Sequence, residues 1–260
     1  MLRLRNVSLV LGKKEVLKNV SLDIPPQGNI SIIGESGSGK TLLLELLIGM
    51  RCPTKGVVEV DGTDLMSVPE GALPLYRRRL GIMLHDRLVL PDQTAIQNIA
   101  FPLSLQGLPS KEARSRAVQA LDALGIRSLE NDRGQALSKG EASLVALARA
   151  SVGAPLIILL DEPFDGMTEM EMQRAAHFLK TLHASGKTIV SCGRSMDLAM
   201  RIGSRCLKLA NGILAEEPAA TSTEEKAPDL NELARSALAA RGKLHTQPIQ
   251  RKIRVTSINS

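Results

Sequence analysis

Aromatic residues are scarce in this 260-residue chain, which has no tryptophan, one tyrosine and three phenylalanines. Proteins that bind single-stranded nucleic acid stack bases on aromatic side chains, so this composition offers little material for such a surface. The formal net charge of +6 therefore indicates solubility, or attraction to phosphates or anionic lipid. We expect no nucleic-acid partner.

Long apolar runs are also missing. No stretch approaches the about 20 residues that a membrane-spanning helix needs. The segment from Met1 to Val7 alternates like a strand and lacks the apolar centre of a signal peptide. The cysteines, Cys52, Cys192 and Cys206, show neither metal-ligand spacing nor an even-numbered disulfide pattern. We expect reduced thiols and a chain that stays in the cytoplasm unless a partner holds it at a membrane.

What the chain does contain is a glycine-rich motif between an apolar run at 30–33 and a leucine-rich run at 42–47. The motif matches the phosphate-binding pattern G-x-x-x-x-G-K-[ST]. Its glycines let consecutive backbone N–H groups turn toward a polyphosphate, and the helix that follows points its partially positive end at the same anion. The sequence therefore predicts a site for a nucleoside triphosphate. Its residues are Gly34, Glu35, Ser36, Gly37, Ser38, Gly39, Lys40 and Thr41.

A second motif supplies two carboxylates. The apolar run 156–160 predicts a buried strand, and Asp161 and Glu162 follow it directly. Thr41 is expected to ligate magnesium, Asp161 can hold the ion through its waters, and Glu162 can polarise the water that attacks the terminal phosphate. A strand that ends in acidic residues is common, so the prediction depends on the glycine-rich motif, whose Lys40 is expected to reach the outer phosphates.

The order of the patterns predicts an α/β protein, and 43% hydrophobic residues suffice for a substantial core. Strand patterns near the start predict a small antiparallel sheet, residues 92–150 have a helical pattern, and strands then alternate with helices as in a parallel sheet. Residues 216–229 resemble a linker in composition, and a short helix at 230–240 and a basic end follow. The predicted strands are 2–10, 16–24, 29–33, 57–60, 156–160, 188–191 and 205–209, and the predicted helices are 111–124, 170–184 and 196–202.

A third motif, Leu137-Ser138-Lys139-Gly140-Glu141, lies shortly before the acidic strand. With all three motifs in this order, residues 1–214 resemble the ATP-binding subunit of an ABC transporter, and the third motif is similar to that family's signature. Ser138 with Glu141 three residues later also forms an ordinary capping box at the start of a helix. Both interpretations can hold together.

The resemblance implies a P-loop NTPase core with a mostly parallel sheet, an N-terminal antiparallel β subdomain and a helical subdomain inserted at about 86–150. The ATP-binding domain would span 1–217, and 218–260 would be a linker and C-terminal extension. It implies ATP and Mg²⁺ as cofactors and a second ATP-binding subunit, identical or different, packed head to tail. Ser138 and Gly140 would then contact the terminal phosphate of the ATP bound by the other subunit.

The resemblance also implies integral membrane permease subunits as partners and a peripheral place on the cytoplasmic face of the inner membrane. The segment 90–103 resembles the part that contacts a coupling helix of the membrane subunit, and its apolar members, including Leu90 and Phe101, are equally consistent with the core of the helical subdomain. Residues 77–124 look most similar to bacterial importers and to envelope-lipid or lipoprotein transporters. Nothing in the chain selects a cargo or a direction of transport.

Five residues depart from what is usual in the family. Leu11 takes the place of an aromatic residue that stacks on adenine, and a leucine keeps only apolar contact. His85 takes the place of a glutamine that contacts magnesium or the attacking water. Lys139 replaces the first of two signature glycines, and Thr168 replaces an aspartate. Arg194 replaces a histidine at the terminal phosphate and is fixed as a cation.

These matches and departures predict an ATPase that powers transport by ATP-dependent dimer closure, with slower or altered hydrolysis. Glu162, Lys40, Arg194 and His85 would act in catalysis, Leu11 would lie at the adenine, and Thr41, Asp161 and His85 would lie at the metal. One alternative is a degenerate subunit that binds ATP and acts as a scaffold or regulator. Another is an ABC-type ATPase without a transporter, which the transporter-like helical insertion disfavours.

Overall fold

The computed structural model describes residues 1–85 and 88–216. The chain separates into two units, Met1–Ala219 and Ala220–Ser260, and every described residue belongs to the first. The helix predicted at 230–240 and the C-terminal extension lie outside the described residues.

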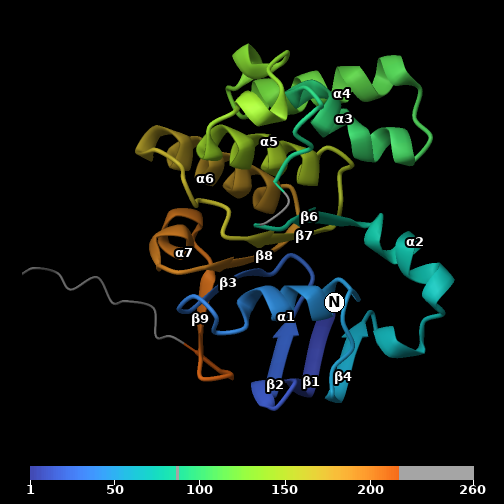
Figure 1. The fold of residues 1–260 in the computed structure, drawn as a ribbon, viewed down its shortest axis with the longest axis vertical. Helices are drawn as coiled ribbons and strands as arrows, with labels where there is room; N and C mark the ends of the chain where they lie inside the picture. Colours follow the sequence, from blue (N-terminus) through green and yellow to red (C-terminus); the bar gives the residue numbers. More distant parts are fainter. Residues whose placement is uncertain (86–87, 217–260) are drawn as a thin grey trace, which may run out of the picture. The chain divides into compact units, whose positions relative to one another are not determined.

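The N-terminal part forms an antiparallel sheet, as predicted, with four strands in the order β2-β1-β4-β5. Figure 1 shows β2, β1 and β4 side by side. Gly12 (φ 61°) makes the turn between β1 and β2, a backbone conformation that favours glycine. Buried leucines and valines of this sheet belong to the same core as the first helix. The strands are β1 (Leu2–Leu11), β2 (Lys14–Ile24), β4 (Lys55–Val60) and β5 (Thr63–Asp64).

A six-stranded sheet in the order β10-β9-β3-β8-β7-β6 forms the centre of the unit. All neighbouring strands are parallel except the antiparallel pair β9 and β10. The central strands β7 and β8 are almost wholly buried because helices or the other sheet cover both of their faces. The strands are β3 (Asn29–Ile33), β6 (Leu80–Met83), β7 (Ile157–Asp161), β8 (Thr188–Gly193), β9 (Arg205–Ala210) and β10 (Ile213–Glu216).

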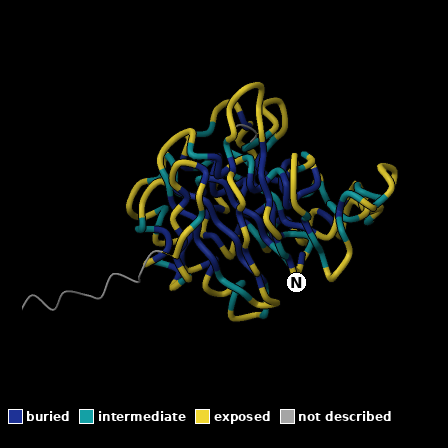
Figure 2. Tube along the Cα trace, turned by 90° about the horizontal axis from the view of Figure 1, so that it is seen from below, coloured by how far each residue is buried: buried dark blue, intermediate teal, exposed yellow. Residues whose placement is uncertain are grey.

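The buried side chains of the central sheet divide between two separate cores. Leu159 packs with α1 and the antiparallel sheet, whereas Ile158 and Leu160 pack with α3, α4, α5 and α6 on the opposite face. The buried strands and helices surround these cores, and the exposed loops lie at the rim (Figure 2). The helices are α1 (Lys40–Leu47), α2 (Leu73–Arg77), α3 (Ala95–Leu105), α4 (Ser110–Ala123), α5 (Lys139–Ser151), α6 (Glu169–Ala184) and α7 (Asp197–Ile202).

The helices α3, α4 and α5 form the inserted helical part between β6 and β7. Thr94 and Ser138 each N-cap a helix in a complete capping box, and Gly125 (φ 65°) follows α4 as predicted. Within the described ranges, no helix combines the length and the apolar character that a membrane crossing requires. The predicted α/β fold with a mostly parallel sheet, an N-terminal antiparallel sheet and a helical insertion is confirmed.

Candidate functional site

The register of three parallel strands brings the predicted site residues to one edge of the central sheet. Ile33 of β3 pairs with Gly193 of β8, and Cys192 of β8 pairs with Asp161 of β7. The strands therefore end at the same level, and the loops that follow them begin side by side. In open α/β sheets, ligands bind beyond the carboxyl ends of the strands.

The glycine-rich loop requires glycine at both of its ends. A Cβ on Gly34 would lie 2.4 Å from the carbonyl oxygen of Leu209 and 2.7 Å from Ser38 Oγ. Gly39 has φ 106° and N-caps α1, so the helix begins directly at Lys40. Ser38 Oγ is buried and has no hydrogen-bond partner within the described residues. An unpartnered buried hydroxyl in a loop of this kind fits an oxygen-rich ligand such as a phosphate.

Lys40 carries a nearly buried ammonium group, with a side chain that is 6% exposed. It donates hydrogen bonds to the carbonyl oxygens of Gly34 (2.7 Å) and Glu35 (3.0 Å), and its Nζ lies 3.5 Å from Glu162 Oε1. A buried ammonium is tolerated only with such partners. The same position at the start of α1 points the positive end of the helix toward the loop.

Thr41 Oγ1 donates a hydrogen bond of 2.7 Å to Asp161 Oδ2. A hydroxyl and a carboxylate are the hard oxygen ligands that magnesium prefers. The described residues contain no group of three or more His, Cys, Asp or Glu side chains arranged to hold a metal. The oxygens of Thr41 and Asp161 fit an ion that takes two ligands from the protein and the rest from phosphate and water.

Glu162 adopts a left-handed backbone conformation (φ 49°), which is uncommon for a residue other than glycine and clusters at functional sites. Its N–H donates to the carbonyl oxygen of Cys192 at 2.9 Å, which fixes the turn out of β7. Its Oε1 lies between two cations, 3.5 Å from Lys40 Nζ and 3.6 Å from Arg194 Nε. The carboxylate is thereby aimed into the space in front of the glycine-rich loop.

Asp165 is a further carboxylate near this site that was not predicted from the sequence. Asp165 Oδ2 lies 2.5 Å from Lys139 Nζ and 3.6 Å from His85 Nε2, and its Oδ1 lies 3.6 Å from Arg194 Nη2. The hydrogen bond from Lys139 is the main cause that lowers the pKa of Asp165, and the charges of the three partners add to it. These partners come from three distant parts of the chain, so no local motif marks Asp165.

Most of the predicted residues meet around a cavity of about 230 Å³. A neighbouring cavity of about 380 Å³ is lined by the others of the loop, namely Gly34, Glu35 and Ser38, and by lysines of β2 and β9. The first cavity is lined by Ser36, Gly37, Gly39, Lys40, Thr41, Leu42, His85, Asp161, Glu162 and Arg194.

Leu11, Ser138 and Gly140 line neither cavity. Leu11 ends β1 and is 39% exposed. Ser138 is exposed, and its hydroxyl accepts the Glu141 N–H at the start of α5, so the predicted capping box is confirmed. Gly140 is required for packing, because a Cβ there would lie 2.9 Å from the carbonyl oxygen of Gly166.

Thr168 also has a structural task in this chain. Its hydroxyl accepts the N–H of Glu171, and its own backbone N–H donates to the Glu171 carboxylate at 2.6 Å, which completes a capping box at the start of α6. The aspartate usual in the family is thus replaced by a residue that serves as the N-cap of this helix.

Comparisons with known proteins agree with this geometry. A family model described as ABC transporter matches residues 17–165, more than half of the chain. The lipoprotein-releasing system ATP-binding protein LolD of Bacteroides fragilis is 32% identical over 215 residues, which cover 82% of this chain and 99% of LolD. The methionine import ATP-binding protein MetN of Brucella abortus is also 32% identical over 215 residues, and the match spans 58% of MetN.

A solved structure is similar over nearly its whole length. It is the dimer of the ATP-binding cassette MJ0796 in a post-hydrolysis state, bound to ADP and Pi. It has a TM-score of 0.77 and 30% sequence identity, and the match covers 83% of this chain and 98% of MJ0796. The family match, the relatives and this structure together show that the chain belongs to the ABC transporter family, as an ATP-binding subunit of the ABC ATPase type.

Proposed function

We propose that this subunit binds Mg²⁺ and ATP in the 230 Å³ cavity and hydrolyses ATP to power a transporter through closure of a dimer. The observation that carries the proposal is the meeting of Lys40, Thr41, Asp161 and Glu162 at one sheet edge, with Thr41 hydrogen-bonded to Asp161 at 2.7 Å. Each of these residue types has a separate task in phosphoryl transfer.

Binding falls to the glycine-rich loop and the two oxygen ligands. Backbone N–H groups of the loop and the Lys40 ammonium hold the outer phosphates, and bound Mg²⁺ would neutralise their charge. Thr41 and Asp161 are the ligands that we assign to the ion. His85 lines the same cavity, and because magnesium prefers oxygen we place its imidazole at the terminal phosphate and the attacking water.

Hydrolysis needs a base and a counter-charge. We assign the base to Glu162, which accepts a proton from water while the water oxygen bonds to the terminal phosphorus and the bond to the ADP oxygen breaks. Lys40 and Arg194 lie 3.5 and 3.6 Å from this carboxylate and hold it in place. Arg194 also supplies positive charge for the phosphoryl group that is transferred.

The second half of each site would come from another subunit. Ser138 is exposed and lies away from the cavity in its own chain, as expected of residues that face a partner's ATP. The dimeric MJ0796 structures support this arrangement. The N-terminus of α5, capped by Ser138, would then point its positive end at the terminal phosphate.

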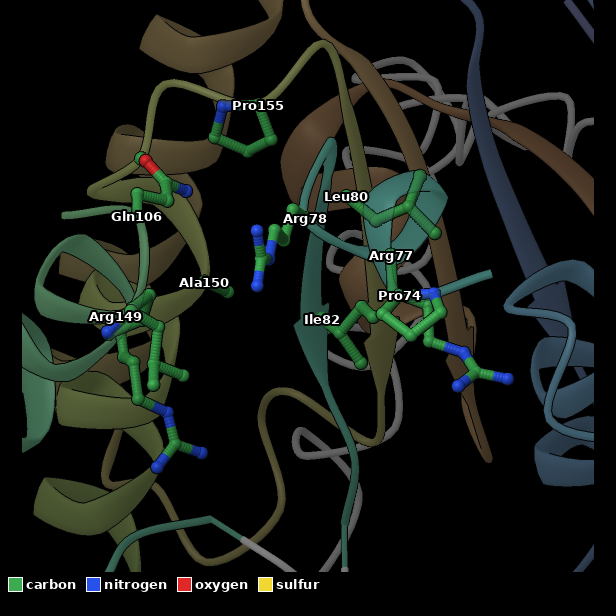
Figure 3. A pocket seen from close by; sticks show the side chains of 12 residues that line it. Pro74, Arg77, Arg78, Leu80, Ile82, Gln106, Arg149, Ala150 and Pro155 are labelled. Carbon is green, nitrogen blue, oxygen red and sulfur yellow. The ribbon is translucent and has the colours of Figure 1, made fainter. Parts of the chain in front are cut away.

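A membrane subunit would dock in a groove of about 360 Å³ beside α2, β6, α3 and α5 (Figure 3). Its lining includes three arginines and no acidic residue, and Figure 3 shows Arg78 reaching between β6 and Gln106. Arg77 donates hydrogen bonds to the carbonyl oxygens of Ile48 and Gly49, and among the described residues no carboxylate pairs with Arg78. We therefore assign the groove to an apolar segment that carries a carboxylate. Leu90 and Phe101 are 38% and 45% exposed and do not line this groove.

The two relatives described above belong to lipoprotein release and to methionine import. The chain covers 99% of LolD and only 58% of MetN, so the whole-length match favours the lipoprotein-releasing type. Membrane partners of either type would place the subunit on the cytoplasmic face of the inner membrane.

The test is ATP turnover by the complex purified with its membrane partner. Turnover that requires Mg²⁺ and rises on assembly supports the proposal, whereas ATP binding without turnover favours the degenerate subunit that acts as a scaffold. Arg78→Glu is expected to abolish co-purification of the membrane partner, and Arg116→Glu on α4 is the matched control. Co-purification unchanged by Arg78→Glu would remove the groove from the proposal.

A further inference from the structure

Three of the residues that depart from the family pattern meet at one carboxylate. His85 follows β6, Lys139 begins α5 and Arg194 follows β8, and all three lie within 3.6 Å of the Asp165 oxygens. Their usual counterparts, a glutamine, a glycine and a histidine, carry no permanent charge. Lys139 and Arg194 add two permanent cations to the site, and a nearby anion offsets the repulsion between them.

The loop that carries Asp165 is packed tightly against the start of α5. A Cβ on Gly166 (φ 76°) would lie 2.7 Å from Lys139 Cγ and Cδ, so the lysine stem covers this glycine. Ser143 Oγ donates to the carbonyl oxygen of Asp165 at 3.4 Å. These contacts fix the loop, and they place the Asp165 carboxylate between the start of α5 and the cavity.

Asp165 also connects to the predicted base through Arg194. The guanidinium of Arg194 lies 3.6 Å from Asp165 Oδ1 on one side and 3.6 Å from Glu162 Oε1 on the other, and Glu162 is in turn 3.5 Å from Lys40 Nζ. Arg194 is 56% exposed, so these two carboxylates are the groups that restrict its direction. The lowered pKa of Asp165 keeps its carboxylate ionised near neutral pH.

We propose that Asp165 is a positioning residue that aims Arg194 at the terminal phosphate and balances the charge of Lys139. The proposal rests on the assignment of Arg194 to that phosphate. With Asp165 removed, Arg194 keeps its charge and its place in the chain and loses one of the two anchors that set its direction. Small displacements of a group that contacts the reacting atoms cost up to about a hundredfold in rate.

The first test is turnover by the purified transporter complex with Asp165→Asn. The expected result is a kcat about 10- to 100-fold lower, with ADP affinity close to that of the wild type and an unfolding temperature only slightly lower. Asp165→Glu, which keeps the charge, should recover part of kcat. Asp122→Asn, which breaks a surface ion pair with Arg127, is the control and should change nothing.

The second test does not depend on turnover. Orthovanadate bound with Mg²⁺ and ADP imitates the phosphoryl group in transfer, so the gain in ADP affinity that vanadate causes reports on Arg194. Both Asp165→Asn and Arg194→Ala should reduce this gain by about tenfold, and the double variant should reduce it no further.

The outcomes separate the proposed hydrolysis of ATP from the proposed positioning role of Asp165. Vanadate binding by the wild type without turnover would refute hydrolysis. The role of Asp165 would still be supported if the effects of Asp165→Asn and Arg194→Ala on vanadate binding are not additive in the double variant. Full turnover and full vanadate binding by Asp165→Asn would refute the positioning role alone. Additive losses in the double variant, a parallel loss of ADP affinity, or no vanadate effect in the wild type would equally refute it.

Discussion

Replacement of Glu162 by glutamine gives the sharpest test of the hydrolytic site. The amide has the size of the carboxylate, and the left-handed backbone turn is held by the bond from the Glu162 N–H to Cys192, which the change leaves intact. Lys40 keeps its two carbonyl acceptors at 2.7 and 3.0 Å. The fold and the phosphate-binding loop should therefore survive, and only the base and one negative charge are lost.

The loss of a general base reduces turnover by about 10²- to 10⁴-fold, which corresponds to about 2.7–5.4 kcal/mol of activation free energy. ATP affinity should stay the same or increase, because the neutral amide would not repel the polyphosphate while Lys40 and Arg194 remain. The Glu162→Gln variant should thus bind ATP and fail to hydrolyse it. Turnover is measured by phosphate release from the complex with its membrane partner, and affinity by calorimetry.

Lys40→Ala is the matched variant. It removes the nearly buried ammonium that the structure places between the loop carbonyls and Glu162, so turnover and ATP affinity should both fall. Turnover of Glu162→Gln within about a factor of two of the wild type would contradict the assignment of the base. A parallel fall of affinity and turnover in Glu162→Gln would show that this carboxylate is needed for binding instead.

Three further predictions concern stability and pH. Gly140→Ala should lower the unfolding temperature measured by calorimetry by several degrees, because its Cβ would lie 2.9 Å from a backbone oxygen and overpacking costs about 1–3 kcal/mol. Gly71→Ala is the control and should leave that temperature unchanged, because its Cβ would meet nothing within 4 Å. Tyr76→Phe should cost about 1 kcal/mol in urea denaturation, since it removes a 2.6 Å hydrogen bond to the last carbonyl of α1. Asp165 has a pKa below its ordinary 3.8, so its stability advantage over Asp165→Asn should be complete above pH 3.8 and decline as the pH falls through the lower, folded-state pKa. A mutational effect that grows toward acid pH would contradict this sign.

The strands and loops that form the nucleotide site could be predicted because their signals are local. The apolar run before Gly34, the glycines and the leucines after Lys40 specify a strand, a loop and a helix within about twenty residues. β3 was predicted with its observed bounds, and α1 follows the glycine-rich loop and contains the leucine-rich run 42–47, as predicted. β6 and β10 were not predicted, because four residues are too few to show a period and both strands take their stability from neighbours distant in sequence.

The site residues divide in the same way. Thr41 and Asp161 are brought together by a strand register between β7, β8 and β3 that no single segment specifies, and their shared role was predicted from the chemistry of the phosphate-binding and acidic motifs. Asp165 was not predicted because an acidic residue in a loop has no distinctive pattern, and its three basic partners become neighbours only after folding. The sequence shows which side chains are available, whereas the fold decides which of them share one space.

The departures from the family pattern are therefore interpreted differently once the structure shows that they lie around one carboxylate. Taken one at a time, His85, Lys139 and Arg194 are three losses at positions that handle the nucleotide, which favours weak hydrolysis. Taken together, they are cations or potential cations around one ionised carboxylate, and Lys40, Thr41, Asp161 and Glu162 remain in place beside them. Unpaired charges in a partly buried site are costly, and these charges balance one another beside an intact phosphate-binding loop. This arrangement is more consistent with substitutions that compensate one another in an active site than with separate losses of function.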